Sequence, residues 1–339
     1  MPDYFGETVD QLVTIEVKNR GAPFGILRPL YEAARRKHGG RPLTILIAEA
    51  LNSRVKPGDS VLIVTGAGYV PTMEKGESDG PPGAAALARA LHKGLGAVPV
   101  FVVEDNHVDV MRAAAMAAGL GLRSFAEASD QRLGGAILAA PADQADIPAW
   151  IDATVAETRP AALIGVERLA PGRDGAIYAA KGLPLSGPNA INEGLIDISD
   201  IMPAAAKAGA LTVGIGDHGN ELGFGAIYDA VVDIMPHGDK LATPIAADLV
   251  LPAMTSNWGA YGVEACLAFL LDRPELMHAP EMEERILRRC FDAGVLEAAG
   301  FTADFLVDGL DGETSVSVVQ ILGNIVRKNL EKPAGYAGR

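Results

Sequence analysis

Short apolar runs that alternate with helix-length segments are the feature that most constrains the fold of this 339-residue chain. Each run is rich in Val, Ile or Leu and breaks off into glycine or polar residues. The runs are Ser60–Thr65, Val98–Val103, Ala162–Val166, Leu211–Ile215 and Asp248–Leu251. Continuous apolar strands joined by helical crossovers are typical of a parallel sheet that is buried on both faces. The sequence therefore predicts an α/β fold with a doubly wound, mainly parallel sheet.

The two ends of the chain differ from this pattern and predict helical additions. Residues 1–55 carry apolar positions at three- and four-residue spacing, which indicates a helical N-terminal extension. Residues 280–339 predict a mainly helical C-terminal extension, in which Thr302–Val307 is a candidate edge strand. The sequence contains no evident repeat or low-complexity linker, so we expect residues 1–339 to form a single α/β domain.

Charge and composition exclude several classes of partner. The formal net charge of −14 opposes binding to nucleic acid or to an anionic membrane surface. No stretch approaches the roughly 18 apolar residues of a membrane helix, and the acidic N-terminus does not resemble a signal peptide. Cys266 and Cys290 are expected to be buried thiols in a reducing compartment. We therefore expect a cytoplasmic protein with a small-molecule ligand. A homodimer is also predicted, although composition and charge do not bear on it.

Parallel sheets bind ligands beyond the carboxyl ends of their strands, so the loops that leave the predicted strands are the candidate site. The first loop, Thr65–Gly83, carries Glu77, Ser78 and Asp79. A loop of this length is usually functional, although a surface lid with a helix cap is the plainer alternative. We predict Asp79 as a site residue.

The second loop, Gly165–Gly182, concentrates charge directly after a buried strand. Glu167 and Arg168 follow the strand, and Arg173 and Asp174 come later in the loop. Guanidinium groups bind carboxylates through two parallel hydrogen bonds, so the arginines are predicted to clamp a substrate carboxylate. Surface ion pairs of little energetic consequence are the alternative.

The third loop, Gly214–Gly225, has two interpretations. Gly214, Gly216 and Gly219 form the G-x-G-x-x-G pattern of a dinucleotide-binding turn, and Asp233 stands at the spacing of its ribose-binding acid. Against an NAD site, Asp217 and His218 occupy the turn that a pyrophosphate would approach, and a carboxylate there repels it.

Paired carboxylates are the other interpretation of this loop. Asp217 and Glu221 are four residues apart and would share one face of a helix beginning here. Such a pair can divide into base and acid, or into base and metal ligand. His218 takes part directly or is a neutral packing residue.

The fourth loop, Thr255–Gly262, reads TSNWGAYG. Asn257 and Tyr261 are four residues apart, and Trp258 could form an apolar wall, whereas helix packing is the alternative for all three. All four loops are expected to converge on one site at the carboxyl edge of the sheet.

Taken together, the blocks GESDGPPGAAALARAL, Gly165–Gly182, GIGDHGNELGFG and TSNWGAYG resemble the signature blocks of the D-glutamate cyclase family. The resemblance covers roughly Leu43 to Asn329. It differs at His218, where the family tends to carry glycine, and in the segments Leu169–Pro171 and Tyr178–Gly182. The family's polar and glycine positions fall on Asp79, Gly80, Glu167, Arg168, Gly172, Arg173, Asp174, Gly182, Gly216, Asp217, Gly219, Asn220, Glu221, Gly223, Ser256, Asn257, Trp258 and Tyr261.

The resemblance implies a lyase that converts D-glutamate, or a related small amino acid or carboxylate, to 5-oxo-D-proline with loss of water, without an organic cofactor. Asp217 or Glu221 would be the base, and backbone N–H groups of Gly216–Gly219 would stabilise the oxyanion. The predicted catalytic residues, which are also candidate ligands for Mg²⁺ or Mn²⁺, are Asp79, Glu167, Asp217 and Glu221. The predicted substrate-binding residues are Arg168, Arg173, Asp174, Gly216, His218, Gly219, Asn220, Ser256, Asn257, Trp258 and Tyr261. A nicotinamide-dependent oxidoreductase and a non-catalytic small-molecule-binding domain remain the alternatives.

Overall fold

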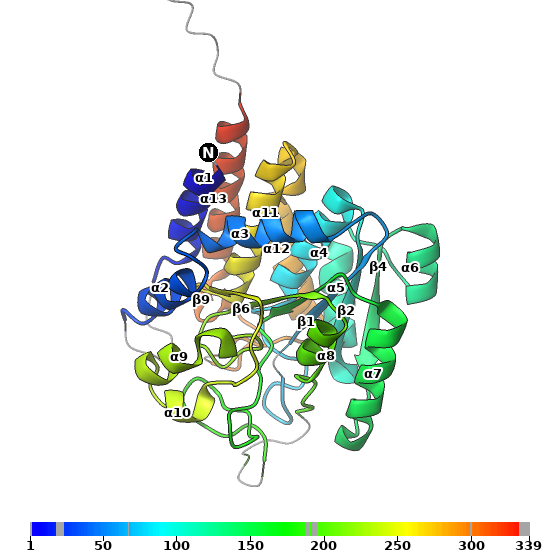
Figure 1. Ribbon diagram of the computed structural model, residues 1–339, viewed down its shortest axis with the longest axis vertical. Coiled ribbons are helices and arrows are strands. Elements are labelled where there is room, and N and C mark those ends of the chain that lie inside the picture. The colour runs from blue at the N-terminus through cyan, green and yellow to red at the C-terminus, as the bar shows by residue number, and fades with distance from the viewer. Residues whose placement is uncertain are drawn as a thin grey trace, which may run out of the picture.

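The computed structural model describes residues 2–17, 24–66, 68–187, 190, 195–298 and 300–331. Within these residues, seven strands form one sheet in the order β3-β4-β2-β1-β5-β6-β7, and all neighbouring strands are parallel (Figure 1). The strands are β1 (Ser60–Thr65), β2 (Val98–Glu104), β3 (Leu122–Arg123), β4 (Gly135–Ala140), β5 (Ala162–Val166), β6 (Leu211–Gly216) and β7 (Leu249–Pro252). The prediction of a doubly wound α/β fold is confirmed.

Helices cover both faces of this sheet. On one face lie α1 (Pro2–Val13), α2 (Leu27–Lys37), α3 (Leu43–Arg54), α4 (Pro81–Leu95), α5 (Val108–Ala117), α11 (Ser256–Leu270), α12 (Pro280–Asp292) and α13 (Gly312–Leu330). On the other lie α6 (Phe125–Gln131), α7 (Ile147–Thr158) and α8 (Ile201–Lys207). Side chains of β1 alternate between the two faces of the sheet. Val61 and Ile63 pack against the helices of the first face, and Leu62 and Val64 pack against those of the second.

Shorter elements complete the described chain. They are α9 (Tyr228–Ile234), α10 (Gly238–Leu241) and the 3₁₀ turns η1 (Asp105–His107), η2 (Gln144–Asp146), η3 (Gly225–Ile227) and η4 (Pro274–Leu276). No described helix is both long and apolar enough to cross a membrane. Cys266 and Cys290 are free and buried, as expected.

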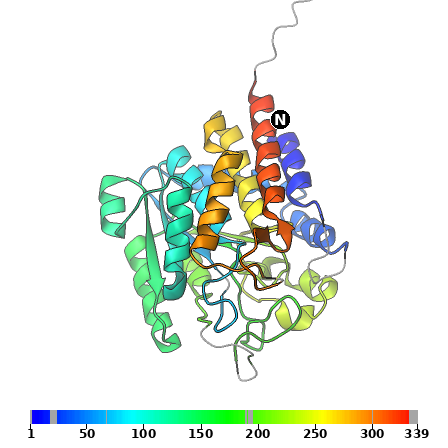
Figure 2. The same ribbon diagram turned by 180° about the vertical axis from the view of Figure 1, so that it is seen from behind.

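The terminal helices are part of the main core. Figures 1 and 2 show α13 beside α1, and Phe5 of α1 stacks on Phe269 of α11 with ring centroids 4.0 Å apart. The predicted edge strand at Thr302–Val307 is wrong. Leu306–Val307 forms β8, which pairs antiparallel with β9 (Leu310–Asp311) in a separate ribbon.

Strands β3 and β4 were not predicted from the sequence. Strand β4 reads GAILAA, and Gly and Ala are weak strand formers. Strand β3 has only two residues, too few for a recognisable apolar run. Both strands depend on pairing along the β2 side of the sheet.

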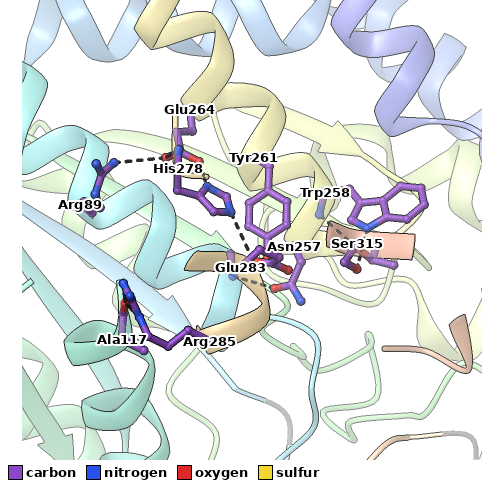
Figure 3. A network of polar contacts seen from close by, with 12 residues as sticks. Arg89, Ala117, Asn257, Trp258, Tyr261, Glu264, His278, Glu283, Arg285 and Ser315 are labelled. Carbon is purple, nitrogen blue, oxygen red and sulfur yellow. Dashed lines mark hydrogen bonds and ion pairs between the residues drawn. The ribbon is translucent and has the colours of Figure 1, made fainter. Parts of the chain in front are cut away.

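A buried polar network fixes α11, the helix whose first turn enters the candidate site. His278 lies between two carboxylates, with Nδ1 2.6 Å from Glu264 and Nε2 3.3 Å from Glu283 (Figure 3). The hydroxyl of Tyr261 donates to Glu283 at 2.8 Å, and Arg89 of α4 lies 3.8 Å from Glu264. The network therefore joins α4, α11 and α12 through groups that are almost fully buried.

The charge of His278 should make the stability of the protein depend on pH. Burial alone would lower the pKa of His278, but Glu264 and Glu283 outweigh it and raise the pKa from 6.5 to about 9. Because the folded state binds this proton more tightly than the unfolded state, the stabilisation is complete below pH 6.5 and is lost as pH rises through about 9. We expect the difference in free energy of unfolding between wild type and His278→Gln to shrink by about 3 kcal/mol across that range. Chemical denaturation at a series of pH values measures it, and a pH-independent difference would contradict a charged His278.

Candidate functional site

Three carboxylates meet where the chain order of the sheet reverses. From β1, the chain adds strands on the β2 side of the sheet first, and then adds β5, β6 and β7 on the other side of β1. The strand order therefore reverses between β1 and β5, and sheets of this kind bind ligands at the carboxyl ends of the strands at such a switch point. Asp79 follows β1, Glu167 follows β5 and Asp217 follows β6. One oxygen of each lies within 4.8 Å of the others, and all three residues are buried. We call these three residues the acidic centre.

Asp79 and Asn257 tie two helix N-termini together across this centre. The Asp79 carboxylate accepts backbone N–H groups of Ser256 and Asn257, at the start of α11, at 2.7 and 2.8 Å. In return, the Asn257 side-chain oxygen accepts the N–H groups of Gly80 and Gly83, at the start of α4, at 3.0 and 2.7 Å. Each side chain thus satisfies N–H groups that its partner helix leaves unpaired. The first and fourth loops meet as expected, and Asn257 contributes by holding them together.

Glu167 is held in a backbone conformation that few side chains adopt. Its φ is +48°, and its carboxylate accepts a 2.5 Å hydrogen bond from the Ser256 hydroxyl. Among the described residues, the buried hydroxyl of Thr65 has no hydrogen-bond partner, and a Cβ built on Gly80 would lie 2.8 Å from both this hydroxyl and the Cβ of Glu167. An unpaired buried hydroxyl beside carboxylates is a position where a ligand atom can bind.

The electrostatics of the acidic centre favour a positively charged ligand. Burial, followed by the charge of Asp217, raises the pKa of Glu167 well above its ordinary value. Burial, followed by the charges of Asp308 and Asp217, does the same for Asp79. Carboxylates this close repel one another, so either protons or a cation must neutralise part of their charge.

The predicted helix at Asp217–Glu221 is not formed. Residues 217–224 form a loop between β6 and η3, and the Glu221 carboxylate folds back into it. That carboxylate accepts the backbone N–H groups of Asp217, His218 and Gly219, each at 2.7 Å. Burial, followed by the charge of Asp217, raises the pKa of Glu221 to about 7. Since Glu221 already occupies these donors, the prediction that this turn stabilises an oxyanion is wrong.

The same contacts explain the glycine pattern without a dinucleotide. A Cβ on Gly216 would lie 2.5 Å from the carboxyl carbon of Glu221, so glycine is required for the carboxylate to pack there. Asp233, which stands at the spacing of the ribose-binding acid, lies in helix α9. The geometry of the dinucleotide fingerprint is therefore not formed.

His218 lies at the edge of the acidic centre. Its Nδ1 is 2.5 Å from an Asp217 oxygen, and its side chain is 15% exposed. His218, Asp217 and Glu221 form a second group of potential metal-ligating atoms within 4.8 Å of one another. Asn220 connects the third loop to the second, because its side-chain amide donates to the carbonyl of Tyr178 at 2.8 Å.

The two arginines do not form the predicted carboxylate clamp. Arg168 is 1% exposed and pairs with Glu104 of β2 at 2.6 Å, while also donating to the carbonyls of Gly66 and Ile196. Burial alone would raise the pKa of Glu104, but Arg168 and His107 lower it to about 2. The two terminal nitrogens of Arg168 are thus occupied by the protein's own carboxylate and carbonyls, whereas its buried Nε has no hydrogen-bond partner among the described residues.

Arg173 and Asp174 lie on the exposed part of the same loop. The Arg173 guanidinium is 4.0 Å from the ring centroid of Tyr228 in α9. Asp174 accepts hydrogen bonds from the Ala176 N–H at 3.0 Å and the Tyr178 hydroxyl at 2.5 Å. These contacts stabilise the loop locally, and Arg173 is exposed whereas Arg168 is buried.

Trp258 and Tyr261 both pack inside the protein, which was the alternative to the apolar wall suggested for Trp258. The indole N–H of Trp258 donates to Ser315 of α13 at 3.1 Å (Figure 3). Tyr261 donates to Glu283, and both aromatic residues are almost fully buried. Helical spacing alone could not distinguish a wall of the site from the core side of α11.

The sequence assigned no functional role to Thr65, Glu77, Glu104 or Asp308. Glu77 lies two residues before Asp79 and is 7% exposed. Asp308 is in the turn between β8 and β9, and its charge acts on both Glu77 and Asp79. Glu77 could have been selected from its place in the first loop, but no local signal connects Asp308 to residues more than two hundred positions away.

Comparisons with known proteins show the family of the chain. Human D-glutamate cyclase, a mitochondrial protein, is 37% identical to this chain over 111 residues. That match covers 32% of this chain and only 17% of the human protein. The family model of the D-glutamate cyclase-like C-terminal domain matches residues 27–323, which include all four loops and every residue of the acidic centre. The chain therefore belongs to the D-glutamate cyclase-like family.

Proposed function

We propose that the protein is a lyase that closes D-glutamate, or a closely related amino acid, into a cyclic amide with loss of water. The observation that carries the proposal is the acidic centre, built at the switch point of the sheet by segments within the family match. In the reaction the amine nitrogen forms a bond to the γ-carboxyl carbon, and one C–O bond of that carboxylate breaks. Both protons that the ammonium loses leave with the departing oxygen as water, so the reaction balances without a redox cofactor.

Asp217 is the base that we assign to this reaction. The ammonium must lose a proton before its nitrogen can attack, and a carboxylate within hydrogen-bonding reach can accept it. From the sequence, Asp217 or Glu221 was the candidate base, with Asp217 favoured. Three backbone N–H groups hold Glu221 inside its turn, whereas Asp217 belongs to the acidic centre and contacts His218. These contacts favour Asp217 as the residue that faces substrate.

The residues of the acidic centre fit a divalent metal ion. Asp79, Glu167 and Asp217 supply oxygens at compatible distances, and oxygen ligands suit Mg²⁺ or Mn²⁺. The unpaired hydroxyl of Thr65 lies beside them. When bound, such an ion would make the γ-carboxylate more electrophilic. We expect that no organic cofactor is needed. A cytoplasmic location and a homodimer remain predictions from the sequence.

Glu167→Gln should lower the affinity for Mn²⁺ at least about tenfold, because one anionic ligand becomes neutral. Isothermal titration calorimetry with MnCl₂ measures the affinity. The matched control is Glu157→Gln on the exposed face of α7, which should bind Mn²⁺ like wild type. Equal affinity in all three proteins would exclude Glu167 as a ligand.

The function itself is tested by turnover. Purified protein is incubated with D-glutamate, with and without Mn²⁺, and 5-oxo-D-proline is measured by chromatography, with L-glutamate and NAD-dependent oxidation assayed in parallel. Product formation from D-glutamate supports the cyclase. Ligand binding by thermal shift with no turnover would instead support the non-catalytic binding domain.

A further inference from the structure

Thr65 is the last residue of β1 and lies at the switch point of the sheet. In the register of β1 and β5 it stands opposite Val166, the residue before Glu167. Because side chains alternate along a strand, Thr65 points to the same face as Val61 and Ile63. This face is covered by α4 and α11, whose first turns are tied together across the acidic centre. The fold therefore brings the Thr65 hydroxyl to the acidic centre.

The hydroxyl of Thr65 is buried without a use in the fold. The residue is fully buried, and its Oγ1 has no hydrogen-bond partner among the described residues. A Cβ built on Gly80 would lie 2.8 Å from this oxygen and 2.8 Å from the Cβ of Glu167, so both side chains border the same small space above Gly80. Burying an unpaired hydroxyl costs free energy, and valine would have nearly the same shape without that cost. Packing therefore does not explain the hydroxyl.

Other donors around the acidic centre already have acceptors in the protein. Asp79 accepts the first two N–H groups of α11, and Glu167 accepts the Ser256 hydroxyl. Glu221 accepts three N–H groups of the turn after β6. The hydroxyl of Thr65, by contrast, has a proton to donate and no acceptor among the described residues. A ligand atom in the acidic centre can supply that acceptor.

Ring closure creates an oxygen that needs such a donor. As the amine nitrogen bonds to the γ-carboxyl carbon, an electron pair of the C–O π bond moves onto oxygen. The pair returns to form the amide C=O when the other oxygen leaves with two protons as water. Ionised carboxylates can only accept hydrogen bonds, so those of the acidic centre cannot stabilise this oxyanion. A fixed, buried hydroxyl can, because it donates a hydrogen bond where the negative charge develops.

We propose that the Thr65 hydroxyl donates a hydrogen bond to the oxyanion that forms on the γ-carboxyl carbon during ring closure. The inference rests on the proposed function and adds a catalytic residue to it. Thr65 takes the role that the sequence assigned to the Gly216–Gly219 turn, whose donors bind Glu221. It keeps its own proton throughout. Since the charge develops only in the transition state, Thr65 should affect kcat more than KM.

Thr65→Val removes the hydroxyl and keeps the shape of the side chain. Its kcat for D-glutamate should fall about 100-fold or more, the usual effect of removing one oxyanion donor. KM and the affinity for Mn²⁺ should stay within about threefold of wild type, because the donor acts on the transition state. The melting temperature should equal or exceed that of wild type, since no unpaired hydroxyl is buried. Thr65→Ser keeps the donor and should retain kcat within about tenfold.

The matched control is Thr212→Val in β6 of the same sheet. Thr212 lies at the opposite end of β6 from Asp217, and its hydroxyl donates to the Asp248 carboxylate at 3.0 Å and accepts the Asp248 N–H at 2.9 Å. Because the fold uses this hydroxyl, Thr212→Val should lower the melting temperature and leave kcat within about twofold of wild type. The two threonine variants should therefore have opposite effects on stability and turnover.

Several results would contradict the inference. A loss of Mn²⁺ affinity in Thr65→Val would make the hydroxyl a metal ligand, and a lower melting temperature would make it a structural group. An equal loss of kcat in Thr65→Ser would assign the effect to the methyl group. If Thr65→Val does not fold, Thr65→Ala, which also removes the hydroxyl, decides by its kcat. Active wild type with an equally active Thr65→Val refutes this inference alone, whereas inactive wild type refutes the proposed function and this inference together.

Discussion

Asp217→Asn should lower turnover of D-glutamate by about two orders of magnitude or more, the usual scale of general-base catalysis. Asparagine keeps the size of the side chain but cannot accept the proton of the ammonium. Substrate affinity should change much less, because the amide oxygen of asparagine can still accept a hydrogen bond from the ammonium. Steady-state kinetics and the melting temperature, measured on the same variant, test the assignment.

A purely structural role for Asp217 as a helix cap would instead predict a loss of roughly 1 kcal/mol in stability with activity mostly retained. No helix begins at Asp217 in the structure, so little loss of stability is expected. A destabilised but active variant would refute the role as base. The affinity for Mn²⁺ is measured in parallel: low turnover with metal binding intact identifies the base, whereas loss of metal identifies a ligand.

Arg168→Met should destabilise the protein by about 3–5 kcal/mol, because it removes the arginine partner of the buried Glu104 carboxylate and leaves only His107 beside it among the described residues. Methionine preserves much of the side-chain volume, so the lost charge dominates the effect. Denaturant unfolding measures the change. Adding Glu104→Met to this variant should recover part of the loss, since replacing both members of a buried ion pair costs less than breaking it.

The matched control is Arg173→Met, which removes an exposed arginine from the same loop. Its free energy of unfolding should stay within about 0.5 kcal/mol of wild type. If Arg168→Met were as stable as wild type and failed only in substrate binding, the original prediction of a carboxylate clamp would be restored.

The location of the site could be predicted from the sequence, but most side-chain roles could not. The apolar runs identified the strands of the switch point, and parallel strands end at a common edge. Asp79, Glu167 and Asp217 were therefore expected together. Arg168 was assigned to substrate because a sequence does not show that the end of β2 delivers Glu104 to it.

The sequence by itself determined the layered α/β architecture, because the period and length of apolar runs decide which segments can be buried on both faces. It also determined which loops carry acids. Only the tertiary structure decided what each acid contacts. The Glu221 carboxylate accepts a backbone N–H of its own loop, and the Asn257 side chain joins the first turns of α4 and α11. Asp308, in the turn of the β8–β9 ribbon, raises the pKa of Asp79. The physical reason is that hydrogen bonds and charges act between neighbours in space, and those neighbours exist only after the core has packed.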